Sequence, residues 1–106
     1  MTKIEIQEAI RTRFGAQLEE WKKLHGVIKG YGADGKIGVF RAANIQTLEI
    51  CRAASNGNNF RYDIALVENC WLGGDEELLR DDKYKLGVLL WAETLVEFIT
   101  GEMVEL

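Results

Sequence analysis

Few side chains in this sequence are of types that carry out chemistry, and the most conspicuous group is the glycine run at residues 30–35 (Gly-Tyr-Gly-Ala-Asp-Gly). The run has the G-x-G-x-x-G spacing with which dinucleotide-binding folds bring backbone amides close to a pyrophosphate. That role requires the run to open a helix. Residues 36–40 (Lys-Ile-Gly-Val-Phe) instead predict a strand, so we expect a turn between two strands and no bound nucleotide or other cofactor.

The acidic residues at positions 75–77 and 81–82 are oxygen ligands of the kind that hard cations prefer. Their spacing lacks the alternation of a calcium loop, and helix capping together with the helix dipole accounts for them without a metal. His25 is the only histidine, and no cysteine or carboxylate lies at metal-ligand spacing from it. We therefore expect no metal site and no catalytic residue, which favours a binding protein over an enzyme.

Cys51 and Cys70 are the only cysteines, and both lie among apolar residues at helical spacing. Two thiols without further ligands cannot complete a zinc site. The sequence favours two buried thiols that act as small apolar side chains, and a disulfide or a metal pair is the less favoured alternative.

Length and composition predict a single domain over residues 1–106, with 47% hydrophobic and 28% charged residues. No apolar run approaches the roughly 18 residues that span a membrane. The first five residues lack the pattern of a signal peptide. We therefore expect a cytoplasmic protein that does not bind a membrane.

The net charge of -4 is unevenly distributed along the chain. Residues 1–62 carry ten Lys/Arg against six Asp/Glu, whereas residues 63–106 carry three against eleven. Such asymmetry can support self-association or a basic partner, and a solvated acidic surface is the alternative. The basic residues form no stripe, so we expect no nucleic-acid partner.

The residues around the glycine run predict a β-hairpin over 27–41. Residues 34–35 (Asp-Gly) are the favoured dipeptide for a two-residue type I′ turn, and they lie between two apolar segments. This turn pairs Tyr31 with Gly38, so that the Tyr31 ring is expected to cover the bare glycine backbone. A lone hairpin is only marginally stable in water, so one of its faces must pack on helices or on another chain.

Before the hairpin, the sequence predicts a helix from Thr2 to about Leu24, with residues 1–20 as an N-terminal helical arm. Thr2 and Glu5 have the spacing of a capping box. Apolar residues then recur at steps of three and four. Gly15 is expected to weaken the helix in its middle.

After the hairpin, residues 44–106 predict a helical part. Helices are expected over about 44–56 and 58–72, a short turn over 75–80, and a long last helix from Asp81 or Asp82 to about Met103. The sequence therefore predicts an α+β fold, with one β-hairpin packed on about four helices.

Residues 68–77 (Glu-Asn-Cys-Trp-Leu-Gly-Gly-Asp-Glu-Glu) are the most informative stretch of the chain. Gly73 is expected to end a helix in the left-handed conformation, and Asp75 to cap the next helical turn. Trp71 is expected to anchor the core, because it extends one apolar stripe at helical spacing. The other members of that stripe are Phe60, Ile64 and Val67.

This block, the glycine-broken hairpin, two middle helices and a long final helix occur here in one order. That order resembles the small tail assembly chaperones of siphovirus-type bacteriophages and prophages, including those of gut Bacteroidetes. The resemblance covers about residues 20–106. It implies a non-enzymatic protein of the bacterial cytoplasm that binds the tape-measure protein and helps to recruit tail-tube proteins.

Two other classes remain open. The chain is alternatively a small structural virion protein of the tail or of head completion, or an adaptor or regulatory protein of a mobile element. In each case the partner is another protein.

The predicted last helix is the first candidate for a protein contact, because its apolar residues cover more of the circumference than one core-facing stripe needs. We expect self-association, or capture of a tape-measure segment, through Leu89, Leu90 or Val96.

Overall fold

The Asp-Gly turn forms where the sequence predicts it. In the computed structural model, which describes residues 1–106, Asp34 and Gly35 both take positive φ angles, 53° and 77°. They join β1 (Ile28–Ala33) to β2 (Lys36–Arg41) in an antiparallel pair. The predicted register is confirmed, with Tyr31 opposite Gly38.

A third strand, which the sequence analysis did not predict, completes the sheet. α4 (Asn59–Cys70) is followed directly by β3 (Trp71–Gly74), and β3 pairs antiparallel with β2 to give the order β1-β2-β3. The prediction of a helix closed by a left-handed Gly73 was wrong, because the positive φ of 136° belongs to Gly74. A side chain at Gly74 would collide with the Ile37 carbonyl oxygen.

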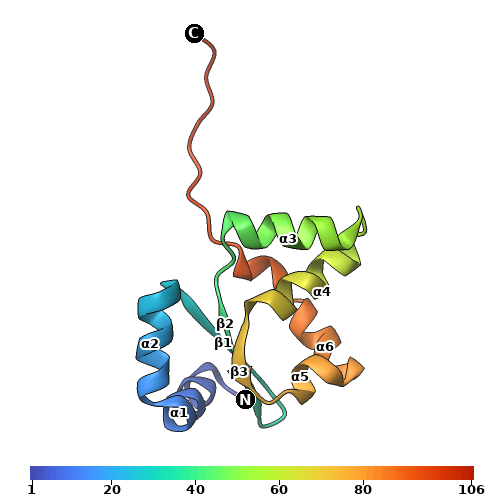
Figure 1. Ribbon diagram of the computed structural model, residues 1–106. Helices are drawn as coiled ribbons and strands as arrows, with labels where there is room; N and C mark the ends of the chain where they lie inside the picture. Colours follow the sequence, from blue (N-terminus) through green and yellow to red (C-terminus); the bar gives the residue numbers. More distant parts are fainter.

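Two helices cover one face of the sheet (Figure 1). α1 (Lys3–Phe14) begins with the predicted capping box, and α2 (Ala16–His25) follows after Gly15, whose φ of 52° breaks the helix. The small core beneath them contains Ile10, Ile37 and Val39.

The remaining helices form a group on the other side of the sheet (Figure 1). They are α3 (Ile45–Ser55), α4, α5 (Glu77–Arg80), α6 (Asp82–Leu89) and the 3-10 helix η1 (Ala92–Leu95). The caps that the sequence indicates are present at Asn44, Asn58 and Asp81. The larger core on this side contains Phe40, Cys51, Leu66, Val67, Cys70, Leu78, Val88 and Leu95, among others. The α+β prediction is therefore confirmed, although the chain has six α-helices and three strands.

The long last helix was predicted wrongly. α6 ends at Leu89, and residues 97–106 form an extended segment that leaves the body of the molecule (Figure 1). Long-range backbone pairing prevents a helix from continuing past Leu95. The Ala43 N–H donates to the Leu95 carbonyl at 2.8 Å, and Ala43 forms a parallel bridge with Val96, which holds that part of the chain extended.

The predicted stripe on α4 was also wrong in part. Val67 is buried, but Phe60 is 56% exposed, and the buried face of α4 consists of Leu66, Val67 and Cys70. Trp71 lies on β3, where it is half-buried.

Trp71, and not Tyr31, covers the bare backbone of Gly38. A Cβ atom at Gly38 would lie 2.5 Å from the Trp71 ring and 3.2 Å from Leu78. The ring also meets Phe40 edge-on, with 5.3 Å between the ring centroids and an interplanar angle of 77°. Gly38 therefore provides the space into which Trp71 packs.

Asp75 does not cap a helix, as the sequence analysis expected, but joins three elements. Its Oδ2 accepts a hydrogen bond from the Ile37 N–H at 2.9 Å, and its Oδ1 accepts from Arg13 Nη1 at 2.8 Å. Its own N–H donates to the Ile37 carbonyl at 2.8 Å. α1 is thus tied to β2 and to the end of β3. The Ile37 N–H, and then Arg13, lower the pKa of the Asp75 carboxyl below its usual value.

We predict that Trp71→Ala lowers the free energy of unfolding by about 3 kcal/mol, because it removes a ring packed on Gly38 and Phe40. Trp91→Ala is the matched control, since Trp91 is 59% exposed, and should change it by less than about 0.5 kcal/mol. Urea unfolding followed by circular dichroism measures both. Equal losses in the two variants would contradict the packing role of Trp71.

We predict that Asp75→Asn lowers the free energy of unfolding by about 1–2 kcal/mol near neutral pH, because a charged hydrogen-bond acceptor is lost. A lowered pKa means that this stabilisation is complete above the ordinary value of 3.8 and disappears as the pH falls through the lowered value. The parent and the variant should therefore converge below pH 3.8. Urea titrations across this pH range test it, with the unbonded Asp82→Asn as the control. A difference that stays constant with pH would show that the carboxylate charge is unimportant.

Candidate protein-binding surface

The glycine run serves close packing between α1 and the sheet. Gly30 and Gly32 lie in β1, directly beneath α1. A Cβ atom at Gly32 would lie 2.5 Å from Ile6, and one at Gly30 would collide with Ile10. Both glycines are thus explained by the approach of the helix.

The acidic residues are distributed over separate structural roles. Asp81 caps α6 by accepting from the Lys83 N–H at 3.0 Å. Glu76 pairs with Arg80 at 2.8 Å. No group of three or more His, Cys, Asp or Glu side chains is arranged to hold a metal ion, and His25 is exposed at the end of α2.

Cys51 and Cys70 lie in the larger core as free thiols, as the sequence favours. Both are completely buried. Burial raises the pKa of both thiols above the ordinary value of 9, and that of Cys70 to about 11.

The three residues predicted to bind a partner do not form one surface. Leu89 and Val96 are half-buried and pack against the larger core, whereas Leu90 is 84% exposed. Leu86 is also exposed and lies one helical turn before Leu90. We call Leu86 and Leu90 the α6 patch. α6 is fixed beneath it by the buried Val88.

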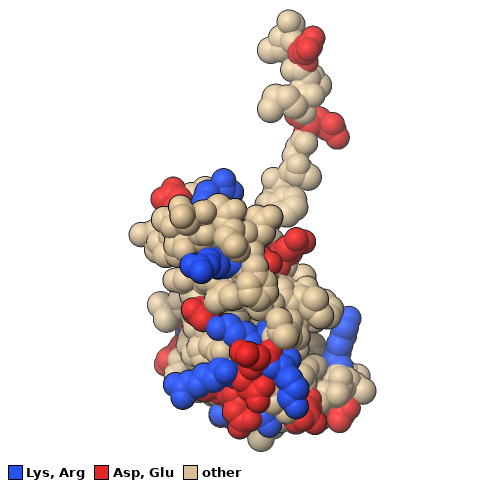
Figure 2. Space-filling model, turned by 90° about the vertical axis from the view of Figure 1, so that its right-hand side faces the viewer, with Lys and Arg blue, Asp and Glu red and all other residues tan.

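A second exposed apolar surface is the extended segment 97–106, which we call the tail. Figure 2 shows the tail standing clear of the body, with acidic side chains among uncharged ones and no basic residue. Its five large apolar side chains are each at least 71% exposed. They are Phe98, Ile99, Met103, Val104 and Leu106.

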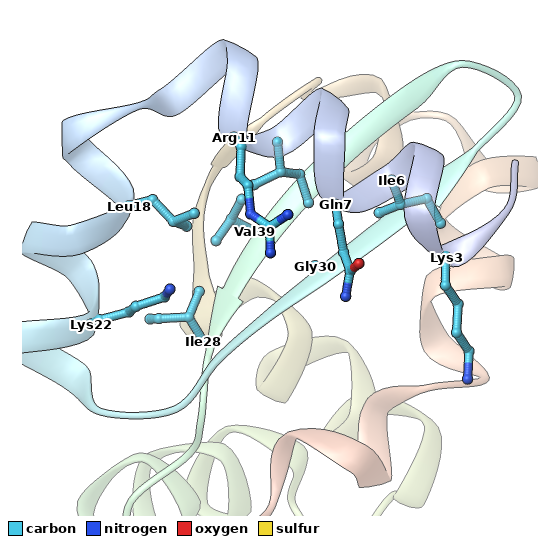
Figure 3. Close-up of a pocket in the computed structure, with 10 residues that line it drawn as sticks. Lys3, Ile6, Gln7, Arg11, Leu18, Lys22, Ile28, Gly30 and Val39 are labelled. Carbon is cyan, nitrogen blue, oxygen red and sulfur yellow. The ribbon is translucent and has the colours of Figure 1, made fainter.

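Two hollows flank β1. The first, about 390 Å³, lies between the helices α1 and α2 and the sheet (Figure 3). Apolar residues such as Ile6 and Ile28 form part of its lining, and Lys3, Arg11 and Lys22 stand around it. The second, about 530 Å³, is lined by Tyr31, Trp91 and Leu95, among others. Gly30 borders both hollows.

Leu86, the tail and the edge of β1 were not predicted from the sequence. Neither Gly87 nor any proline indicated that the helix ends at Leu89. The tail residues were therefore predicted to be helical. The exposed edge could have been found, because a hairpin always has an outer side that needs a partner or protection.

Comparisons with known proteins give no match: no protein-family model, curated protein or solved structure corresponds to this chain. Among its helices, none has both the length and the apolar character needed to cross a bilayer. The exposed apolar surfaces described above are therefore the features from which a function can be argued.

We predict that Cys51 and Cys70 do not react with Ellman's reagent in the native protein at pH 8. Both side chains are completely buried, and a thiol whose pKa is raised remains protonated at that pH. Two thiols should become reactive in denaturant, and the absorbance of the released chromophore counts them. Rapid labelling of a native thiol would contradict the observed burial.

Proposed function

We propose that this chain is a non-enzymatic phage or prophage tail assembly chaperone, which binds the tape-measure protein and helps to recruit tail-tube subunits in the bacterial cytoplasm. The proposal combines two lines of support. One is the resemblance at residues 68–77 and in the order of elements. The other is the α6 patch, in which Leu90, the residue directly after α6, is 84% exposed at the end of a helix anchored in the core.

The exposure of Leu90 is the observation that carries the proposal. A leucine held open on a fixed helix gains no core contacts, whereas burial against a partner removes its apolar surface from water. A tape-measure protein is a long, apolar-rich helical chain. A patch at positions i and i+4 suits contact with one apolar stripe of such a helix.

The remainder of α6 provides a polar border to the patch. Asp82 and Lys83 are exposed on the same helix, and Lys85 pairs with Glu68 of α4 at 2.6 Å. An apolar centre with a charged border is the usual arrangement of a protein interface that is not permanently occupied. A chaperone must release its client, so a small patch of this kind fits the role.

We predict that Leu90→Asp lowers the amount of tape-measure protein recovered with this chain at least tenfold, because a charge is placed at the centre of the contact. Ile45→Asp is the matched control: Ile45 is 75% exposed on α3, away from α6, and an acid is tolerated at a helix start. Co-expression with the adjacent tail proteins, followed by affinity purification, measures the recovery.

Three results would contradict the chaperone proposal. The tape-measure protein could remain insoluble and unbound whether or not the chain is present. Mass spectrometry of purified particles could find the chain in the finished virion, which would support a structural protein. Purification from host cells could recover a host protein in place of the tail proteins, which would support the adaptor.

A further inference from the structure

The outer edge of β1 carries unpaired backbone groups. β1 is at the edge of the sheet and pairs only with β2. In an antiparallel ladder the residues alternate between those that bond to the neighbouring strand and those whose N–H and C=O point away from it. The two-residue turn places Ala33 opposite Lys36 as a bonded pair, so Lys29 and Tyr31 also bond to β2. The groups of Ile28, Gly30 and Gly32 therefore point outward.

The side chains of an added strand would find space on both faces of this edge. The hollow beneath α1 and α2 lies on one face. The second hollow runs around the edge, from Lys3 and Ile6 at the start of α1 to Trp91 and Leu95 on the other face. Gly30 is exposed and borders both. A strand added at β1 would direct alternate side chains into the two hollows.

The tail has the composition of such a strand. It is extended, contains no proline, and forms no hydrogen bond to the body beyond Glu97, whose carboxylate pairs with Lys29 at 2.7 Å. Its apolar side chains fall on both alternating faces, Phe98 and Val104 on one, Ile99 and Met103 on the other. A strand that is apolar on both faces is stable only where both are covered.

The charges of the tail and of the hollow beneath α1 are complementary. The tail carries Glu97, Glu102 and Glu105 and no Lys or Arg. Lys3 and Arg11 stand beside the hollow, and neither forms an ion pair within the chain. Glu102 and Glu105 lie on opposite alternating faces of an extended strand, so one of them would face this hollow, where the opposite charge favours binding and helps to fix its register.

We propose that the tail of one copy of this chain adds as a fourth strand to the β1 edge of a second copy. The occupant is a second copy because the tail leaves its own body near the start of β1 and points away from its own sheet (Figure 1). It extends the molecule to 52 Å along its longest axis, against 29 Å and 23 Å along the others. This inference does not depend on tape-measure binding, since it concerns the purified protein alone.

Two complementary variants of the full chain test this exchange. Phe98→Asp with Ile99→Asp disables the tail and leaves the edge intact. Lys3→Glu with Arg11→Glu reverses the charge beside the edge, so that the edge repels the acidic tail, and leaves the tail itself intact. Light scattering at high micromolar concentration should show the parent chain above its monomer mass of 12.0 kDa and each variant alone at that mass. A mixture of the two variants should restore a complex, because one supplies the edge and the other the tail.

Amide hydrogen exchange locates the contact. Exchange at the outward amides of Ile28, Gly30 and Gly32 should be at least tenfold slower in the parent than in the tail variant, whereas Lys29 and Tyr31 should be unchanged. Ile45→Asp is the control, since it alters an exposed apolar residue outside the tail and outside β1 and should leave self-association intact. Three results would overturn the proposal: a monomeric parent, association that persists in the tail variant, or protected outward amides in a monomer, which would place the tail on its own edge.

Discussion

The burial of β2 on both faces is the constraint on which the rest of this structure depends. Ile37 and Val39 face the small core under α1 and α2, whereas Phe40 faces the larger core formed by the later helices. A strand buried on both faces stabilises the fold only when both layers are present. The chain meets this condition by placing one helical pair before the hairpin and a helical group after it. The two halves of the sequence are therefore held together through one six-residue strand.

β3 follows from the same constraint. The inner edge of β2 would leave buried N–H and C=O groups unpaired, and such groups are costly. Residues 71–74 satisfy them, with Trp71 opposite Phe40 and Gly74 opposite Gly38. The Asp75 carboxylate continues this pairing to the Ile37 N–H and adds the bond to Arg13. The contact between the Trp71 and Phe40 rings and the ion pair between Asp75 and Arg13 thus lie at the two ends of β3. Both join segments that are far apart in the chain.

Features set by neighbouring residues were predictable from the sequence, and features set by distant residues were not. The Asp-Gly turn, its register and the caps at Thr2, Asn44 and Asn58 each depend on interactions within a few residues. β3 pairs with β2, and the backbone at Leu95 and Val96 pairs with Ala43, which in both cases is distant in sequence. The candidate site follows the same division. Leu90 was predicted from helical spacing and is exposed, whereas Leu89 and Val96 pack on the core. The tail residues were predicted to be helical and are extended.

Because α6 ends at Leu89, the apolar residues of the tail lie on an extended segment and not on one face of a helix. A helix continued to Met103 would have kept its hydrogen bonds satisfied and presented one broad apolar face. The extended tail instead exposes both its apolar side chains and its backbone groups, and an adjacent strand can cover the first and pair with the second. Such a segment is suited to pair with a sheet edge, and β1 supplies an edge with apolar space on both sides. The two proposals therefore use separate surfaces: the tail and the β1 edge for self-association, and the α6 patch for a client.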